Sequence, residues 1–197
     1  MSITVKNLSK HYGNQKAVDG ISFTVDKAEI VGFLGPNGAG KSTTMKMITG
    51  YLEADAGDIQ VCGITVDENS IETNKKIGYL PEANPLYPDM YVREYLQFVA
   101  NVHQIKNSKQ VIEEVIKTVG LSLESNKKIG QLSKGYKQRV GLAAALRVRS
   151  CVTTVVLVVG AASMIIIGLR IMRVLQNVVA VLTLTMPSLK VIQILTS

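Results

Sequence analysis

The chain has 197 residues, 47% of them hydrophobic, which is enough for one domain with a sizeable core. Its net charge of +7 is uneven: residues 1–146 hold all 15 acidic residues and 17 of the 22 basic ones, whereas residues 147–197 hold five basic residues and no acid. Because the first part is nearly balanced and shows no basic face with interleaved aromatic residues, we predict that the chain does not bind nucleic acid.

The first 25 residues alternate between apolar and polar side chains. Ile3, Val5 and Leu8 share one face, and a second alternating run follows the polar turn at residues 13–14. This pattern predicts two antiparallel strands. Tyr12 ends the first strand, where its flat ring could stack on a nucleotide base or serve only as an edge-strand tyrosine. No basic and then apolar leader opens the sequence, so we expect no signal peptide.

Residues 35–43 match the phosphate-binding loop pattern G-x-x-x-x-G-K-[ST]. Glycines let the main chain approach a polyphosphate, and the following helix start points its N–H groups at the anion. The lysine would reach the β- and γ-phosphates, and the first hydroxyl would ligate Mg²⁺. An apolar run over 30–34 predicts a buried strand before the loop, and residues 42–49 predict a helix after it. The predicted nucleotide-binding residues here are Gly35, Asn37, Gly38, Gly40, Lys41, Ser42 and Thr43.

The next segments continue an α/β pattern. Short strands are predicted over 58–63 and 76–82, and residues 92–103 and 109–119 carry apolar side chains at helical spacing. A small helical lobe is therefore predicted over about 84–140. Near its end, Ser133 precedes a helix and Gly135 opens the start of that helix toward an anion. By itself, a serine-capped basic helix is most often only a solvated helix.

These motifs together resemble the ATP-binding subunit of ABC transporters over residues 1–146. The phosphate loop, Tyr12 as the adenine-stacking aromatic, and residues 132–139 as the signature loop in the form L-S-K-G-Y-x-Q-R carry the resemblance. Residues 77–87 are most similar to bacterial exporters of the gliding-motility and multidrug type. The resemblance implies an α/β fold: a P-loop NTPase core with an N-terminal antiparallel β lobe and a helical insertion. The signature residues that it implies are Ser133, Gly135 and Gln138.

The resemblance also implies ATP and Mg²⁺ as cofactors. Glu82 stands where most members carry glutamine, a position that senses Mg²⁺ and the attacking water, and a carboxylate can still ligate the metal beside Ser42. Two such subunits would form a homodimer around two ATP molecules, with Ser133 and Gly135 of one copy near the γ-phosphate held by Lys41 of the other. Closure would drive a transmembrane permease, with the subunit peripheral at the cytoplasmic face of the inner membrane.

The resemblance stops after residue 146. The family places a strand ending in Asp-Glu about ten residues further on and a histidine later, but residues 147–197 contain no Asp, Glu or His. Residues 152–159 have the composition of a buried strand and end in Gly160-Ala161-Ala162. We therefore expect an incomplete C-terminal third, assign no catalytic residue, and predict that the chain hydrolyses ATP poorly.

Three interpretations of the tail, residues 147–197, remain open. A reading-frame error or truncation would give it a foreign sequence. Residues 151–169 carry no charge and are flanked by arginines, so they could insert into a membrane. A diverged, inactive subunit could also keep the strand and lose its acids. The alternative function is therefore a non-catalytic, membrane-anchored or unstable fragment dominated by its apolar tail.

Overall fold

The computed structural model describes residues 3–26, 30–67, 71–81, 83–146, 154–159, 162–167 and 189–193. The chain divides into two compact units. The first comprises Met1–Tyr79 with Ser150–Ser197, and the second comprises Leu80–Arg149. Each unit has its own hydrophobic core.

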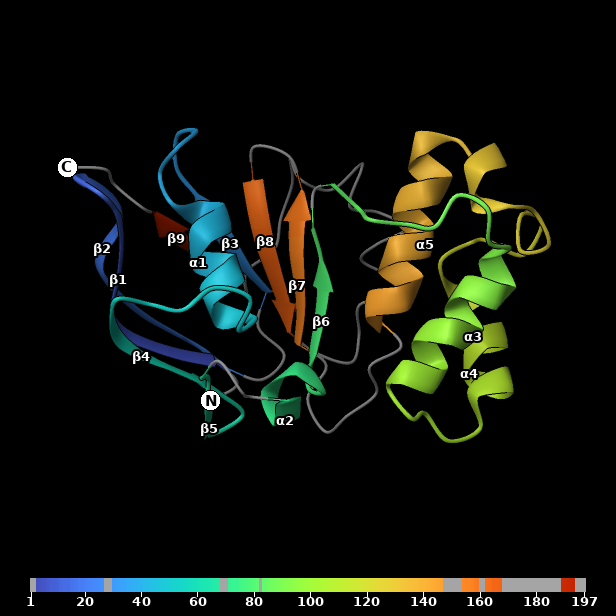
Figure 1. The fold of residues 1–197 in the computed structure, drawn as a ribbon, viewed down its shortest axis with the longest axis horizontal. Helices are drawn as coiled ribbons and strands as arrows, with labels where there is room; N and C mark the ends of the chain where they lie inside the picture. The colour runs from blue at the N-terminus through green and yellow to red at the C-terminus, as the bar shows by residue number, and fades with distance from the viewer. Residues whose placement is uncertain are drawn as a thin grey trace. The chain divides into compact units, whose positions relative to one another are not determined.

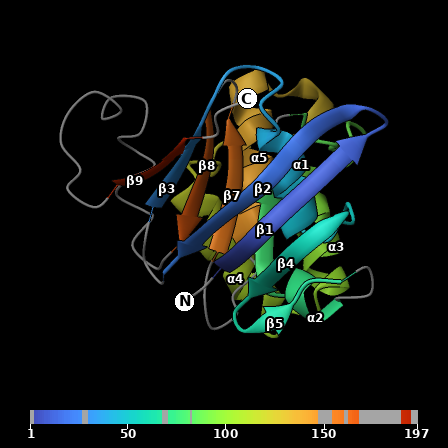
Figure 2. The ribbon, with the colours of Figure 1, turned by 90° about the vertical axis from the view of Figure 1, so that its left-hand side faces the viewer.

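The first unit opens with a four-stranded antiparallel sheet. Its strands lie in the order β2 (Gln15–Val25), β1 (Ile3–Tyr12), β4 (Ala56–Val61), β5 (Ile64–Thr65). Tyr12 pairs with Gln15, so the predicted hairpin and its turn at residues 13–14 are confirmed. Figure 2 shows β1 and β2 as a long hairpin with β4 beside β1.

A second sheet of five strands carries the element that precedes the phosphate loop. Its order is β6 (Ile77–Leu80), β7 (Thr154–Val159), β8 (Ala162–Ile167), β3 (Ile30–Leu34), β9 (Leu189–Gln193) (Figure 1). β8 runs antiparallel to both of its neighbours, whereas β9 runs parallel to β3. The helices among the described residues of this unit are α1 (Lys41–Ile48) and α2 (Ile71–Asn74). The strand expected over 152–159 is present as β7, with residues 152–153 outside the described part, and no sequence pattern predicted β8 or β9.

The possible membrane insertion of 151–169 receives no support from the structure. Within that range the described residues form β7 and β8 rather than a helix; residues 151–153, 160–161 and 168–169 lie outside the described part. Among the described helices, none has the length and apolar character needed to cross a membrane.

Alternating side chains of β1 and one face of α1 build the first core. Ile3 and Leu8 of β1 are fully buried, as are Met45 and Ile48 of α1. Met45 and Ile48 follow the helical period of three to four. In β1 the strand period of two holds from Ile3 to Val5, and a register shift in the pairing with β2 between Val5 and Leu8 returns Leu8 to the buried face. Phe33 of β3, also fully buried, completes this core, which therefore fixes β3 and α1 on either side of the phosphate loop.

The second unit is helical. It contains α3 (Val92–Val102), α4 (Ser108–Thr118), the 3-10 turn η1 (Ile129–Gln131) and α5 (Lys134–Leu146). The helices expected over 92–103 and 109–119 are confirmed as α3 and α4. Leu96, Ile116 and Val140, one from each long helix, are buried together in this core. The core thus holds α5, the helix that begins within the signature loop.

Candidate functional site

The phosphate loop joins the end of β3 to the start of α1. Gly38 and Gly40 have φ angles of 87° and 80°, in the left-handed region that glycine adopts without strain. A Cβ added to Gly40 would lie 2.1 Å from the carbonyl oxygen of Ala17 in β2, whereas one added to Gly38 would meet no described atom within 4 Å. The two glycines therefore differ: both permit the turn, and Gly40 also permits close contact with the hairpin.

Lys41 is held across this loop. Its side chain is buried, and Nζ donates hydrogen bonds of 2.7 Å to the carbonyl oxygens of both Gly35 and Pro36. Lys41 is also the first residue of α1, and the N–H groups of a first helical turn have no acceptor within the helix. The loop thus combines an ammonium group with the positive end of a helix, which suits a polyphosphate.

The hydroxyl groups of the first turn have different surroundings. Ser42 is exposed, and Thr43 is half-buried. Thr44 is buried and donates through Oγ1 to the carbonyl oxygen of Gly40 at 2.9 Å. The exposed serine thus offers an open approach to a metal ion, whereas Thr44 holds the loop. Sequence reasoning missed Thr44, because a threonine that bonds back to its own helix leaves no distinct pattern.

Tyr12 lies at the end of β1, with half of its surface exposed. Asp55, which precedes β4, holds Lys10 and His11, the two residues before Tyr12. Its carboxylate accepts hydrogen bonds of 2.6 Å from Lys10 Nζ and from the His11 main-chain N–H. Two hydrogen bonds hold the pKa of the Asp55 carboxyl below its ordinary value: the one from Lys10 has the larger effect and the one from His11 the smaller. The same carboxylate raises the pKa of Lys10. The sequence did not single out Asp55, because an aspartate in a turn is ordinary.

The signature loop opens α5 in the second unit. Ser133 Oγ accepts a 3.3 Å hydrogen bond from the Tyr136 N–H, as a helix cap does, so the predicted cap is confirmed. Gly135 is exposed and Gln138 is half-buried. Arg139 donates to the Val119 and Gly120 carbonyls at 3.4 and 3.3 Å, so α5 is fastened to the end of α4.

Glu82, the predicted metal-sensing residue, lies outside the described residues. Two positions later, Asn84 donates through Nδ2 to the Lys137 carbonyl oxygen of α5 at 3.3 Å. A Cβ on Gly141 would come within 1.8 Å of that Asn84 nitrogen. The segment after β6 therefore packs directly on the signature helix, a contact that the sequence did not reveal.

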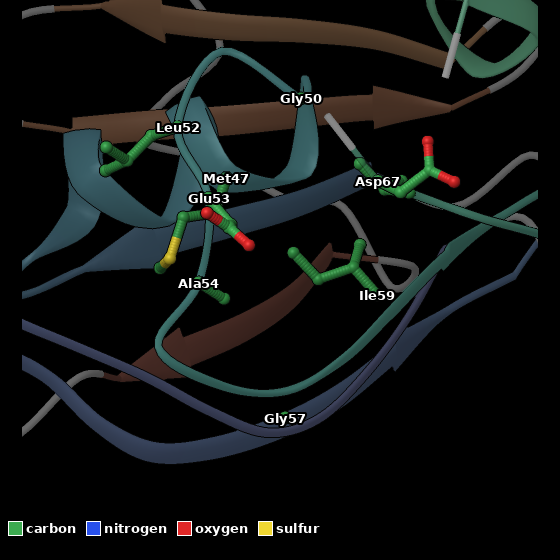
Figure 3. Close-up of a pocket in the computed structure, with 9 residues that line it drawn as sticks. Met47, Gly50, Leu52, Glu53, Ala54, Gly57, Ile59 and Asp67 are labelled. Carbon is green, nitrogen blue, oxygen red and sulfur yellow. The ribbon is translucent and has the colours of Figure 1, made fainter. Parts of the chain in front are cut away.

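A cavity of about 50 Å³ lies at the C-terminal end of α1. Met47, Leu52 and Ile59 line it together with the carboxylates Glu53 and Asp67 (Figure 3). The phosphate loop is at the other end of α1, and this volume accommodates only a few water-sized molecules. We therefore do not assign it to nucleotide binding.

Comparison with known proteins settles the family. The family model described as ABC transporter matches residues 18–155. The chain belongs to the ABC transporter family. It is 40% identical over 148 residues to the bacitracin transport ATP-binding protein BcrA of Bacillus licheniformis, covering 74% of this chain and 48% of that protein. It is 41% identical over 144 residues to the SkfA peptide export ATP-binding protein SkfE of Bacillus subtilis, covering 72% and 59%.

Solved structures of the ABC transporter family share this fold. One, an ATP-binding subunit of an ABC transporter, has a TM-score of 0.69 at 29% identity and covers 75% of this chain and 62% of its own. The dimeric bacterial cassette MJ0796 has a TM-score of 0.66 at 26% identity, covering 74% and 69%. The predicted P-loop NTPase fold and the family are confirmed. The matched part of the chain spans 48% of the length of BcrA and 59% of that of SkfE.

Proposed function

We propose that this chain is the ATP-binding subunit of an ABC exporter and binds Mg-ATP at its phosphate loop. The main support is Lys41, whose buried ammonium lies over the loop at the start of α1. Its two present acceptors are neutral carbonyls, whereas a phosphate would add the attraction between opposite charges to the hydrogen bonds. A triphosphate would therefore compete well for this ammonium group.

Each predicted site residue then has one role. Tyr12 stacks on the adenine, the loop N–H groups bind the phosphates, and Ser42 and Glu82 ligate Mg²⁺. In a homodimer, the signature loop of one copy completes the site of the other; the dimeric structure of MJ0796 supports a dimer. The loop residues are Gly35, Asn37, Gly38, Gly40, Lys41, Ser42 and Thr43, and the signature residues are Ser133, Gly135 and Gln138.

The proposed partner is a transmembrane permease, with this subunit peripheral at the cytoplasmic face of the membrane. Relatives named for bacitracin transport, linearmycin resistance and SkfA peptide export support an export role. These names refer to those proteins and do not identify the cargo of this chain.

Hydrolysis should be slow in this chain. Residues 147–197 supply no Asp, Glu or His, so they offer neither a general base nor a carboxylate for the Mg²⁺ shell. Loss of a positioned general base alone lowers a rate by about 10²- to 10⁴-fold. ATP binding needs neither group, so binding and turnover should be separable here.

Equilibrium titration of the full chain with ATP and Mg²⁺ tests the proposal. Lys41→Ala should weaken ATP binding about ten- to a hundredfold, the loss expected for a charge-assisted hydrogen bond. Lys46→Ala is the matched control, because Lys46 belongs to the same helix but is exposed. A wild-type chain that binds no ATP, or two variants with equal affinity, would overturn the binding claim. ATP turnover at an ordinary rate, abolished by Lys41→Ala, would overturn the claim of slow hydrolysis.

A further inference from the structure

The end of β1 extends beyond its neighbour β4. The last pairing joins Ser9 to Ala56, and the Asp55 N–H donates to the Ser9 carbonyl oxygen at 3.0 Å. In an antiparallel ladder the groups that face one neighbour recur every second residue, so the next N–H on this side belongs to His11. β4 offers no main-chain acceptor there, because it begins at Ala56.

The side chain of Asp55 replaces the missing strand. One carboxylate oxygen accepts from the His11 N–H and the other from Lys10 Nζ, each at 2.6 Å. His11 Nδ1 lies 3.5 Å from the same carboxylate. The carboxylate is ionised at neutral pH, since these donors lower its pKa. One aspartate thus fixes the two residues that directly precede Tyr12.

On its other side, the strand end pairs with β2 of the hairpin. Tyr12 pairs with Gln15 of β2, and its ring is 51% exposed. Without Asp55, the last residues of β1 would lose their anchor on the β4 side, and the tyrosine would sit on a hairpin tip held along one edge. End residues held in this way fray at little cost.

We infer that Asp55 is a positioning residue for nucleotide binding: it continues the ladder beyond β4 and so presents the Tyr12 ring to the base of ATP. This inference rests on the proposed function and adds a residue to it. Asp55 acts on recognition of the base and not on the phosphates, which bind at the start of α1. Its loss should therefore weaken ATP binding while binding of inorganic triphosphate stays unchanged.

Calorimetric titration of the full chain with ATP and with inorganic triphosphate, both with Mg²⁺, separates these effects. Tyr12→Ala should lower ATP affinity about tenfold, as expected for a lost base–aromatic stack. Asp55→Ala should lower it about three- to tenfold, and neither variant should change triphosphate affinity. Asp55→Asn should lie between Asp55→Ala and wild type, because an amide oxygen still accepts from the His11 N–H but does not hold the Lys10 charge.

Asp19→Ala is the matched control. Asp19 also binds a lysine of the hairpin, Lys16 at 3.0 Å, but this pair is exposed, with 61% of the lysine and 48% of the aspartate side chain accessible. The Asp19→Ala variant should leave the affinities for ATP and for inorganic triphosphate unchanged. In a Tyr12→Ala background, Asp55→Ala should cause no further loss of ATP affinity, since the residue that it positions is gone.

The outcomes distinguish the two proposals. If Asp55→Ala and Asp55→Asn lower ATP and triphosphate affinity equally, Asp55 supports the fold in general and the inference is wrong. If neither variant changes ATP affinity while Lys41→Ala still does, the inference fails and the proposed function stands. If Lys41→Ala leaves both affinities at the wild-type value, the proposed function fails and this inference fails with it.

Discussion

Gly40→Ala tests the packing of the phosphate loop against the hairpin, and Gly38→Ala provides the comparison. Both glycines have left-handed φ angles, so alanine costs about 1–2 kcal/mol at either position. Only Gly40 adds an overlap, because its Cβ would lie 2.1 Å from the Ala17 oxygen and 2.9 Å from Val18 Cγ2. A main-chain oxygen cannot move aside as a flexible side chain can.

The overlap at Gly40 should cost a further 1–3 kcal/mol, roughly, as overpacking does in a well-packed core. We therefore expect Gly40→Ala to lower the free energy of unfolding by about 2–5 kcal/mol and Gly38→Ala by about 1–2 kcal/mol. Urea denaturation followed by circular dichroism measures both, provided that the two variants share one m-value.

Equal losses of stability for the two variants would refute this reasoning, because the overlap with β2 is the only difference on which it depends. A larger loss of stability for Gly38→Ala would contradict the close contact between Gly40 and β2. ATP titration of the same variants adds a second readout: Gly40→Ala should also weaken binding, since the loop must move away from β2 to admit the methyl group.

Three further predictions concern single contacts. Gly141→Ala should cost about 1–3 kcal/mol of unfolding free energy through overlap with Asn84, and adding Asn84→Ala should cost less than the sum of the two single changes by urea denaturation. Ser133→Ala removes the cap of α5 and should cost about 1 kcal/mol in the same assay. The pKa of Asp55 is lowered on folding, so its contacts are complete above about pH 4 and are lost as the pH falls through the lower folded value. The stability difference between wild type and Asp55→Asn should therefore be constant between about pH 5 and 7 and shrink below about pH 4.

The sequence by itself determined the local elements and the family. Apolar alternation before Tyr12 predicted the hairpin, and apolar residues at helical spacing predicted α1, α3 and α4. The loop at Gly35–Thr43 indicated the P-loop NTPase fold. These signals are readable because strand and helix periods, turn chemistry and phosphate-loop spacing all depend on residues close together in the chain.

Only the tertiary structure decided which residues support the site. Asp55 and His11 are 44 positions apart, and Asn84 and Lys137 are 53 apart, so neither contact leaves a periodic trace in the sequence. The same holds for Gly40, whose need for glycine comes from Ala17 as well as from its own φ angle. Long-range contacts depend on how strands and helices meet in space, which local patterns do not encode.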